Sequence, residues 1–294
     1  MNGSGVDFAS AVRPMVELAL VEDVAIGDVT TEATIEAGRM GDAHIVAREA
    51  GVLAGLEVAE IAFRQLDPEI VFDGRAADGA ALEPGQEVAR IHGKLRAILT
   101  AERVALNFLG HLSGIATATR RAVDAVGGTG VLISDTRKTT PGHRLLEKYA
   151  VAVGGGVNHR MGLYDMFLVK DNHVAAAGSL TEAVRRVRAS GIELPLEVEC
   201  DSEKQVREAL SLSVGRLLLD NFRGEELERA LESVARARKD GASVEVEISG
   251  GVTLENLHEV ARPGVNYISM GSLTHSSRGL DFSLEVAPRP EGRR

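Results

Sequence analysis

The chain has 294 residues and a formal net charge of −10, with 44% hydrophobic, 26% charged and 3% aromatic residues and no tryptophan. This acidic composition argues against non-specific nucleic-acid binding, which needs basic surface and stacking platforms, and no apolar run approaches the roughly 18 residues of a membrane span. The single cysteine, Cys200, excludes an internal disulfide and an all-cysteine zinc site, and together with the lack of a signal-peptide pattern it favours a cytoplasmic protein of one large or two medium domains.

The first third of the chain mixes short strands with helices. Residues 13–24 have the spacing of an amphipathic helix, and residues 42–66 predict a strand, a glycine turn and a second helix. A turn at 83–85 is followed by the alternation of a strand, and residues 99–126 form a long helical pattern.

From about Gly130 onward, short apolar runs alternate with mostly helical stretches. The runs occupy residues 131–138, 166–173, 194–201, 216–222, 244–251 and 267–275. Their spacing of roughly 20 to 35 residues is typical of βα units, and near-continuous apolar strands indicate a parallel sheet that is covered on both faces. We therefore predict a closed or nearly closed α/β barrel. An open doubly wound sheet is the alternative, although no Gly-x-Gly-x-x-Gly follows a first strand.

Two helix starts can be predicted within this part of the chain. Ser202 with Gln205 matches a capping box, and Thr253 is a candidate N-cap for the last helix.

Polar and charged residues follow most of the predicted strands. Active sites of α/β barrels lie at the carboxyl ends of the strands, so these residues are expected to converge. They are Arg137 and Lys138, Lys170 and Asp171, Glu199, Asp220, Ser249-Gly250-Gly251, and Gly271-Ser272, with His159 and Arg160 between the first two runs.

The adjacent cations of "DTRKTTPG" (135–142) indicate an anion site. Two partly buried cations about 4 Å apart repel by roughly 4 kcal/mol at an effective dielectric near 20, and a bound anion removes that repulsion. From 134 to 173, six Lys or Arg residues face four Asp or Glu residues. The alternative is that Arg137 and Lys138 are solvated loop charges.

The carboxylates and glycine turns extend this interpretation. Glu199 and Asp220 each end an apolar strand and suit Mg²⁺, which takes oxygen ligands together with substrate phosphates. Either one could instead cap a helix or pair with a cation. The turns "SGGV" (249–252) and "MGSLTH" (270–275) can present backbone N–H groups to phosphate.

Several kinds of catalytic group are missing. No Gly-x-Ser-x-Gly elbow occurs, His159 and His173 lack metal-ligand spacing, and Cys200 is expected to be a buried, inert thiol. Lys170 stands where a Schiff-base aldolase would keep its lysine, which is a competing interpretation. The residues otherwise favour an electrostatic anion site with metal support and no protein nucleophile.

The motifs closely resemble those of one family, the quinolinate phosphoribosyltransferases, also called nicotinate-nucleotide pyrophosphorylases (carboxylating). The resemblance covers almost the whole chain. It is carried by "EDVAIGDVTT" (22–31), "AERVALNFLGHLSGIAT" (101–117), "DTRKTTPG" (135–142), "EKYAVAVGGGVNHRMGLYDMFLVKDNH" (147–173), "LEVEC" (196–200), "LLLDNF" (217–222), "EISGGV" (247–252) and "ISMGSLTHS" (268–276).

This resemblance implies a fold and an assembly. It implies an N-terminal α/β sandwich domain over 1–115, joined by the C-terminal segment 276–294, and an incomplete TIM-like α/β barrel over 116–275. It also implies a homodimer or larger homo-oligomer in which Arg103 reaches the partner's site.

The implied reaction joins quinolinate to phosphoribosyl pyrophosphate with Mg²⁺ and without an organic cofactor. It yields nicotinate mononucleotide, pyrophosphate and CO₂, a step of NAD synthesis. Lys138, Lys170, Glu199 and Asp220 are implied as catalytic residues, and Glu199 and Asp220 also as metal ligands. The implied substrate-binding set is Arg103, Arg137, Lys138, His159, Arg160, Lys170, Glu199, Asp220, Ser249, Gly250, Gly251, Met270, Gly271 and His275.

Three residues depart from the family pattern. Ala152 stands where many relatives carry a cation, and Ile248 and Met270 replace smaller residues. We expect these to affect the shape of the pocket and not the type of reaction.

Three other functions remain as alternatives. The first is a paralogue acting on nicotinate or serving molybdenum uptake, the second a Schiff-base lyase using Lys170, and the third a non-catalytic anion-binding protein.

Overall fold

The structure is a computed structural model that describes residues 7–287. The ends of the predicted first domain, 1–6 and 288–294, lie outside the described residues. The chain divides into two compact units, which we call unit 1 (Met1–Ala118, Thr140–Gly154 and Ser277–Arg294) and unit 2 (Thr119–Thr139 and Gly155–Ser276). The sequence-based division into 1–115 with 276–294 and 116–275 remains a prediction; the compact units also assign 140–154 to unit 1.

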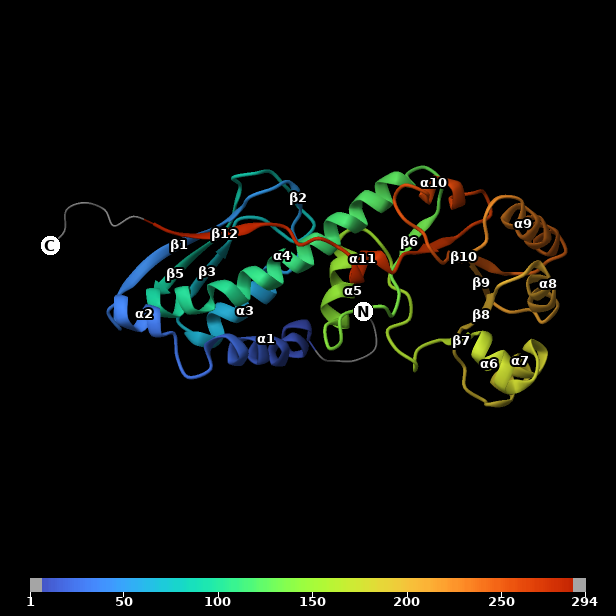
Figure 1. The fold of residues 1–294 in the computed structure, drawn as a ribbon, viewed down its shortest axis with the longest axis horizontal. Helices are drawn as coiled ribbons and strands as arrows, with labels where there is room; N and C mark the ends of the chain where they lie inside the picture. The colour runs from blue at the N-terminus through green and yellow to red at the C-terminus, as the bar shows by residue number, and fades with distance from the viewer. Residues whose placement is uncertain (1–6, 288–294) are drawn as a thin grey trace. The chain divides into compact units, whose positions relative to one another are not determined.

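Unit 1 is an α/β layer built on an antiparallel sheet. Its sheet has four strands in the order β12-β1-β5-β3, and β2 pairs separately with β4. Helices α1, α3 and α4 lie on one side of the sheet (Figure 1). Its elements are α1 (Phe8–Val24), α2 (Val29–Thr34), β1 (Met40–Ala47), β2 (Gly51–Val52), α3 (Leu56–Leu66), β3 (Val71–Gly74), β4 (Ala81–Leu82), β5 (Glu87–Lys94), α4 (Leu95–Ala125, which ends in unit 2), α5 (Arg144–Val153) and β12 (Phe282–Val286).

The C-terminal strand is held in unit 1 by a close backbone approach. β12 pairs antiparallel with β1, from Ala43 opposite Val286 to Ala47 opposite Phe282. The chain reaches this position by passing directly over α4, where a Cβ added to Gly110 would lie 2.7 Å from the carbonyl oxygen of Leu280. A glycine is therefore required at 110 for the last segment to enter the sheet.

Unit 2 is an incomplete α/β barrel with a parallel sheet. Its six strands follow the order β6-β11-β10-β9-β8-β7, and helices α7, α8 and α9 lie outside strands β7 to β10 (Figure 1). After the end of α4, the elements are β6 (Leu132–Ser134), β7 (Phe167–Val169), α6 (Asp171–Ala177), α7 (Leu180–Ala189), β8 (Leu196–Cys200), α8 (Glu203–Ser211), β9 (Arg216–Asp220), α9 (Gly224–Lys239), β10 (Glu245–Ser249), α10 (Leu257–Val260), β11 (Tyr267–Ser269) and α11 (Ser272–His275).

The barrel is left open between its first two strands. β6 and β7 are the two edges of the sheet, and Val157, which makes a parallel bridge with Ser134, is the only additional pairing beside β6 among the described residues. The segment 158–166 then crosses from this bridge to β7. The predicted fold class, an α/β sandwich domain with an incomplete barrel, is confirmed.

Ser202 is the N-cap residue of α8, but its predicted capping box is not formed, and the N-cap predicted at Thr253 is wrong. The Ser202 side chain makes no capping hydrogen bond, and Gln205 accepts instead from the backbone N–H of Asp201 at 2.9 Å. Thr253 lies in a turn closed by Asn256, whose side chain accepts from the Thr253 N–H at 2.8 Å, and α10 begins only after Asn256.

Candidate functional site

The strand register of unit 2 gathers most of the predicted residues at one edge of the barrel. Ser249 lies opposite Asp220 in the β10–β9 pair, and Glu199, which lies opposite Leu218, is two pairs below this level on β8. Lys170 follows β7 directly, as Met270 and Gly271 follow β11. Parallel strands put their carboxyl ends at the same edge, so residues that are up to about 140 positions apart in sequence share one rim.

Lys170 and Glu199 form an ion pair on this rim. The Lys170 ammonium donates to Glu199 Oε2, and the two side chains are 41% and 16% exposed. Lys170 also begins α6, where its backbone N–H donates to His173 Nδ1 at 3.0 Å. His173 therefore accepts a backbone hydrogen bond in the first turn of α6.

Asp220 and the glycine turn after β10 approach each other closely. Asp220 Oδ2 accepts from the Asn221 amide at 2.9 Å. Gly250 has φ +84°, and a Cβ added there would lie 2.8 Å from Asp220 Oδ1 and would also collide with the Asn221 side chain. Arg223 holds the turn by donating to the Gly250 carbonyl. Only glycine fits this position, because the Asp220 and Asn221 side chains occupy the space that a Cβ would need.

The turn after β11 brings together three predicted residues. A Cβ on Gly271 would lie 3.1 Å from Lys138 Cδ and 3.2 Å from His275 Nε2, so these side chains flank the glycine. The Thr274 hydroxyl donates to the Lys138 carbonyl at 2.6 Å and fixes the two loops together. Met270 is buried, 2% exposed, beneath this turn.

The two arginines of the predicted anion site influence each other electrostatically. Burial lowers the pKa of the Arg160 guanidinium, and the charge of Arg137 lowers it further, while Glu197 and Asp165 oppose the change. Arg160 Nη1 donates to the Met166 carbonyl at 3.2 Å, and its buried Nε has no hydrogen-bond partner. Like charges that are held near each other in a partly buried place favour a bound anion.

The segment that carries His159 and Arg160 is fixed by Asp135, which sequence reasoning did not assign. Asp135 is fully buried just after β6. Its Oδ1 accepts from the His159 N–H at 2.9 Å and its Oδ2 from the Asn158 amide at 2.7 Å. The His159 side chain is only 6% exposed, and its predicted role as a direct carboxylate ligand stays a prediction.

A second group of residues missed by sequence reasoning lies inside the barrel. Glu197 and Glu247 are buried, and His159 Nε2 lies 2.9 Å from Glu197 Oε2 and 3.5 Å from Glu247 Oε1. Burial raises the pKa of Glu197 to about 7, and burial followed by the charge of Glu197 raises the pKa of Glu247 to about 7. Arg216 is the nearest cation below them, with its Nη1 3.5 Å from Glu247 Oε2.

Arg103 belongs to a different unit from the other predicted residues. It lies on the unit 1 part of α4 with its side chain 62% exposed, 4.0 Å from Glu102. With Asn107 and the segment 279–282 it lines a cavity of about 380 Å³ in unit 1. The structure therefore gathers the predicted set in unit 2 with the exception of Arg103.

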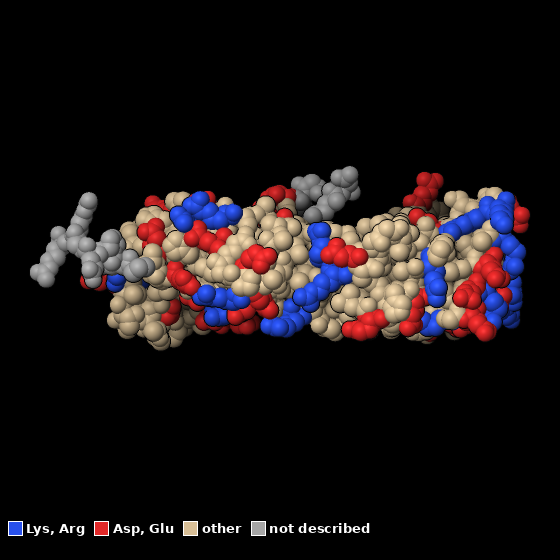
Figure 2. All heavy atoms as spheres, turned by 90° about the horizontal axis from the view of Figure 1, so that it is seen from above, with Lys and Arg blue, Asp and Glu red and all other residues tan. Residues whose placement is uncertain are grey.

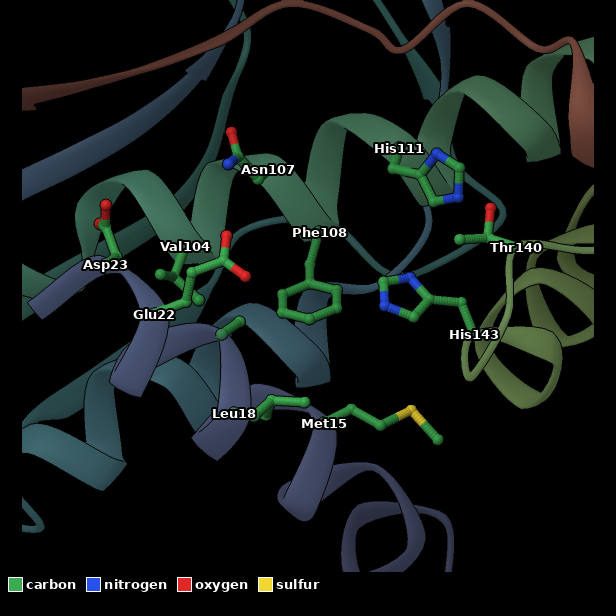
Figure 3. Close-up of a pocket in the computed structure, with 11 residues that line it drawn as sticks. Met15, Leu18, Glu22, Asp23, Val104, Asn107, Phe108, His111, Thr140 and His143 are labelled. Carbon is green, nitrogen blue, oxygen red and sulfur yellow. The ribbon is translucent and has the colours of Figure 1, made fainter. Parts of the chain in front are cut away.

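Unit 1 also has a cavity of about 420 Å³ that lies between α1, α4 and residues 140–143. Figure 3 shows Phe108, His111 and His143 pointing into it from two sides. His111 Nε2 lies 3.0 Å from Glu147 Oε1, which ties α4 to α5. None of the predicted site residues lines this cavity, so it is not the predicted anion site.

The donor chemistry of the rim fits a hard cation and a polyanion together. Glu199 and Asp220 offer carboxylate oxygens on neighbouring strands, as Mg²⁺ prefers. Figure 2 shows Lys and Arg interspersed with Asp and Glu on the face drawn, with no continuous basic surface. Anion attraction therefore depends on the local cations and not on the overall field. Within 7–287, no helix is long and apolar enough to cross a membrane.

Comparisons with known proteins agree over nearly the whole chain. Residues 28–113 match the family model described as quinolinate phosphoribosyl transferase, N-terminal domain, and residues 115–285 match its C-terminal domain. The chain is 47% identical to the nicotinate-nucleotide pyrophosphorylase (carboxylating) of Mycobacterium leprae, covering 94% of this chain and 97% of that protein. It is 43% identical to the probable nicotinate-nucleotide pyrophosphorylase (carboxylating) of Bacillus subtilis, covering 90% of each. The crystal structure of NadC from Streptococcus pyogenes has a TM-score of 0.90 at 40% identity, covering 97% of this chain and 99% of that one.

Proposed function

Since the chain belongs to the quinolinate phosphoribosyltransferase family, we propose that it transfers the phosphoribosyl group of phosphoribosyl pyrophosphate to quinolinate. The products are nicotinate mononucleotide, pyrophosphate and CO₂, and the reaction is a step of de novo NAD synthesis. The alternatives were a paralogue acting on nicotinate and one serving molybdenum uptake. The names of these relatives support the quinolinate reaction and neither alternative.

The observation that carries this proposal is the pair of mutually repelling arginines, Arg137 and Arg160, beside the carboxylate-bearing rim. Quinolinate has two adjacent carboxylates, which together neutralise two guanidinium groups. Arg binds carboxylates through paired N–H donors. A monocarboxylate offers only one carboxylate for the two guanidinium groups.

The reaction needs no nucleophile from the protein. The pyridine nitrogen attacks the anomeric carbon as the bond to pyrophosphate breaks, and the resulting pyridinium accepts the electron pair released when the 2-carboxylate leaves as CO₂. A proton then replaces that carboxylate on the ring. Catalysis rests on alignment and on charge stabilisation of the departing pyrophosphate.

The ion pair of Lys170 argues against the Schiff-base alternative. An amine must be unprotonated to attack a carbonyl, whereas the Lys170 ammonium donates to Glu199. In our proposal Lys170 and Lys138 contact the carboxylate and phosphate groups of the substrates.

The remaining rim residues suit phosphoribosyl pyrophosphate. We assign Glu199 and Asp220 to the ribose hydroxyls and to Mg²⁺, which would neutralise part of the pyrophosphate charge when bound. The turns at 249–251 and 270–271, with His275, are assigned to the 5′-phosphate, supported by the close approach of Lys138 and His275 to Gly271.

The proposal also includes the oligomeric state of the protein and its location in the cell. A homodimer or larger homo-oligomer would let Arg103 contribute to the partner's site, which is consistent with its exposed position on α4. We also propose a cytoplasmic location, where both substrates would be available.

One assay tests the proposal. Pyrophosphate and CO₂ release are measured with phosphoribosyl pyrophosphate, Mg²⁺ and either quinolinate or nicotinate. We expect both products with quinolinate and neither with nicotinate. Turnover of nicotinate alone would favour the paralogue, and borohydride trapping of a carbonyl substrate on the protein would favour the lyase.

A further inference from the structure

A chain of hydrogen bonds connects the barrel interior to Arg160. The Arg160 backbone N–H donates to His159 Nδ1 at 2.8 Å. The other ring nitrogen, Nε2, lies 2.9 Å from Glu197 Oε2. The imidazole therefore stands between a buried carboxylate and the backbone of a residue assigned to the substrate.

These two contacts determine which ring nitrogen carries the hydrogen. Nδ1 faces an N–H donor, so it must offer its lone pair and cannot be protonated. Nε2 therefore carries the hydrogen and donates it to Glu197. His159 is therefore a neutral imidazole with its hydrogen on Nε2. The hydrogen bond from Nε2 to the Glu197 carboxylate stabilises this tautomer.

The same tautomer argues against a metal ion in this cluster. His159, Glu197 and Glu247 each offer a ligand atom, and these atoms lie within 4.8 Å of one another. A metal at Nε2 would need the hydrogen on Nδ1, and ligating histidines normally donate that N–H to an acceptor. Here Nδ1 meets the Arg160 N–H instead.

We propose that Glu197, with Glu247 beside it, is a positioning residue that fixes His159 and through it the Arg160 backbone in the quinolinate site. The inference rests on the proposed function only in naming quinolinate as the ligand of Arg160. Glu197 also supplies the buried negative charge that opposes the repulsion between Arg137 and Arg160. Glu247 approaches the same ring nitrogen as Glu197, with its Oε1 3.5 Å from His159 Nε2.

The first test measures the tautomer in the intact wild-type protein. Nitrogen-15 NMR of histidine-labelled protein, with His159→Gln to assign the signal, distinguishes Nε2–H from Nδ1–H. We expect His159 as the neutral Nε2–H form, with no stoichiometric metal retained after dialysis. An Nδ1–H form, or a bound transition metal at one equivalent, would overturn the proposal.

The second test separates the two substrates. Glu197→Leu removes the acceptor and is expected to raise KM for quinolinate by about tenfold or more, as for other positioning partners, while KM for phosphoribosyl pyrophosphate changes less than about twofold. Glu197→Gln keeps an acceptor oxygen and should restore most of the quinolinate KM. Glu245→Gln, on the same strand as Glu247 but bonded to Arg216, is the matched control and should change neither.

Failure of the positioning role of Glu197 can be distinguished from failure of the proposed function. Equal changes in both KM values, or failure of Glu197→Gln to restore quinolinate binding, would assign Glu197 a merely structural role. If the wild type does not turn over quinolinate at all, the proposed function fails, and the tautomer measurement alone then decides the positioning of His159.

Discussion

The buried acid Glu247 should make the stability of unit 2 depend on pH, and Glu247→Gln should reduce that dependence. Burial, followed by the charge of Glu197, raises the pKa of Glu247 from 4.5 to about 7. A carboxyl group with a raised folded-state pKa binds more protons when folded, so its stabilisation is full below pH 4.5 and is lost as the pH rises through 7. The difference between the pKa values of Glu247 in the unfolded and folded protein corresponds to about 3 kcal/mol in the free energy of unfolding. Because Glu197 titrates with it, we expect Glu247→Gln to gain about 1–3 kcal/mol over the wild type between pH 4.5 and 8.

Amide hydrogen exchange in β8 and β10 provides the assay, because it reports the opening free energy of this unit alone. Rates at pH 5 and pH 8, corrected for the intrinsic exchange of the amides, give the opening free energies of the wild type and the variant. Glu245→Gln, whose side chain is 45% exposed, should keep the pH dependence of the wild type. A difference between Glu247→Gln and the wild type that stays constant or shrinks as the pH rises would refute the reasoning.

Three further predictions concern the rim and the sheet. Arg137→Ala should weaken quinolinate binding by roughly 2–4 kcal/mol through lost charge-assisted hydrogen bonds and stranded partners; unchanged binding in calorimetry would make this assignment wrong. Gly250→Ala puts a Cβ 2.8 Å from Asp220 Oδ1 at φ +84° and should destabilise the turn by about 1–3 kcal/mol, seen as a higher KM for phosphoribosyl pyrophosphate; a wild-type KM would show that the turn does not contact this substrate. Burial, and then the charge of Asp201, raise the pKa of Cys200 to about 12, so a thiol reagent at pH 8 should label it only after unfolding; rapid labelling of native protein would contradict its buried position.

The strands of unit 2 could be predicted because their patterns are local. The six apolar runs of unit 2 became β6 to β11 in the expected order, since continuous hydrophobicity directly reflects burial on both faces of a parallel sheet. The cap predictions failed because other side chains form the local hydrogen bonds: Gln205 accepts from the Asp201 N–H, and Asn256 accepts from the Thr253 N–H. Competition between such short-range hydrogen bonds is not visible in the sequence.

The rim of the site could also be predicted, because topology alone brings strand ends together. The residues behind the rim were missed. Glu197 and Glu247 each stand two positions before a strand-end residue, Glu199 and Ser249, and strand alternation places both members of each pair on the inner face. That alternation was the available signal. The sequence held no signal that residues 140–154 belong to unit 1. Their attachment depends on contacts such as that of His111 with Glu147, which join distant parts of the chain.

The central claim is that Arg137 and Arg160 together bind a pyridine diacid. A crystal structure of the protein with bound quinolinate tests it most directly. The account predicts that both carboxylates of the ligand lie within hydrogen-bonding distance of these guanidinium groups, with the ring nitrogen facing the ribose site beside Asp220. A ligand bound elsewhere, or with both arginines directed away from it into solvent, would contradict the account.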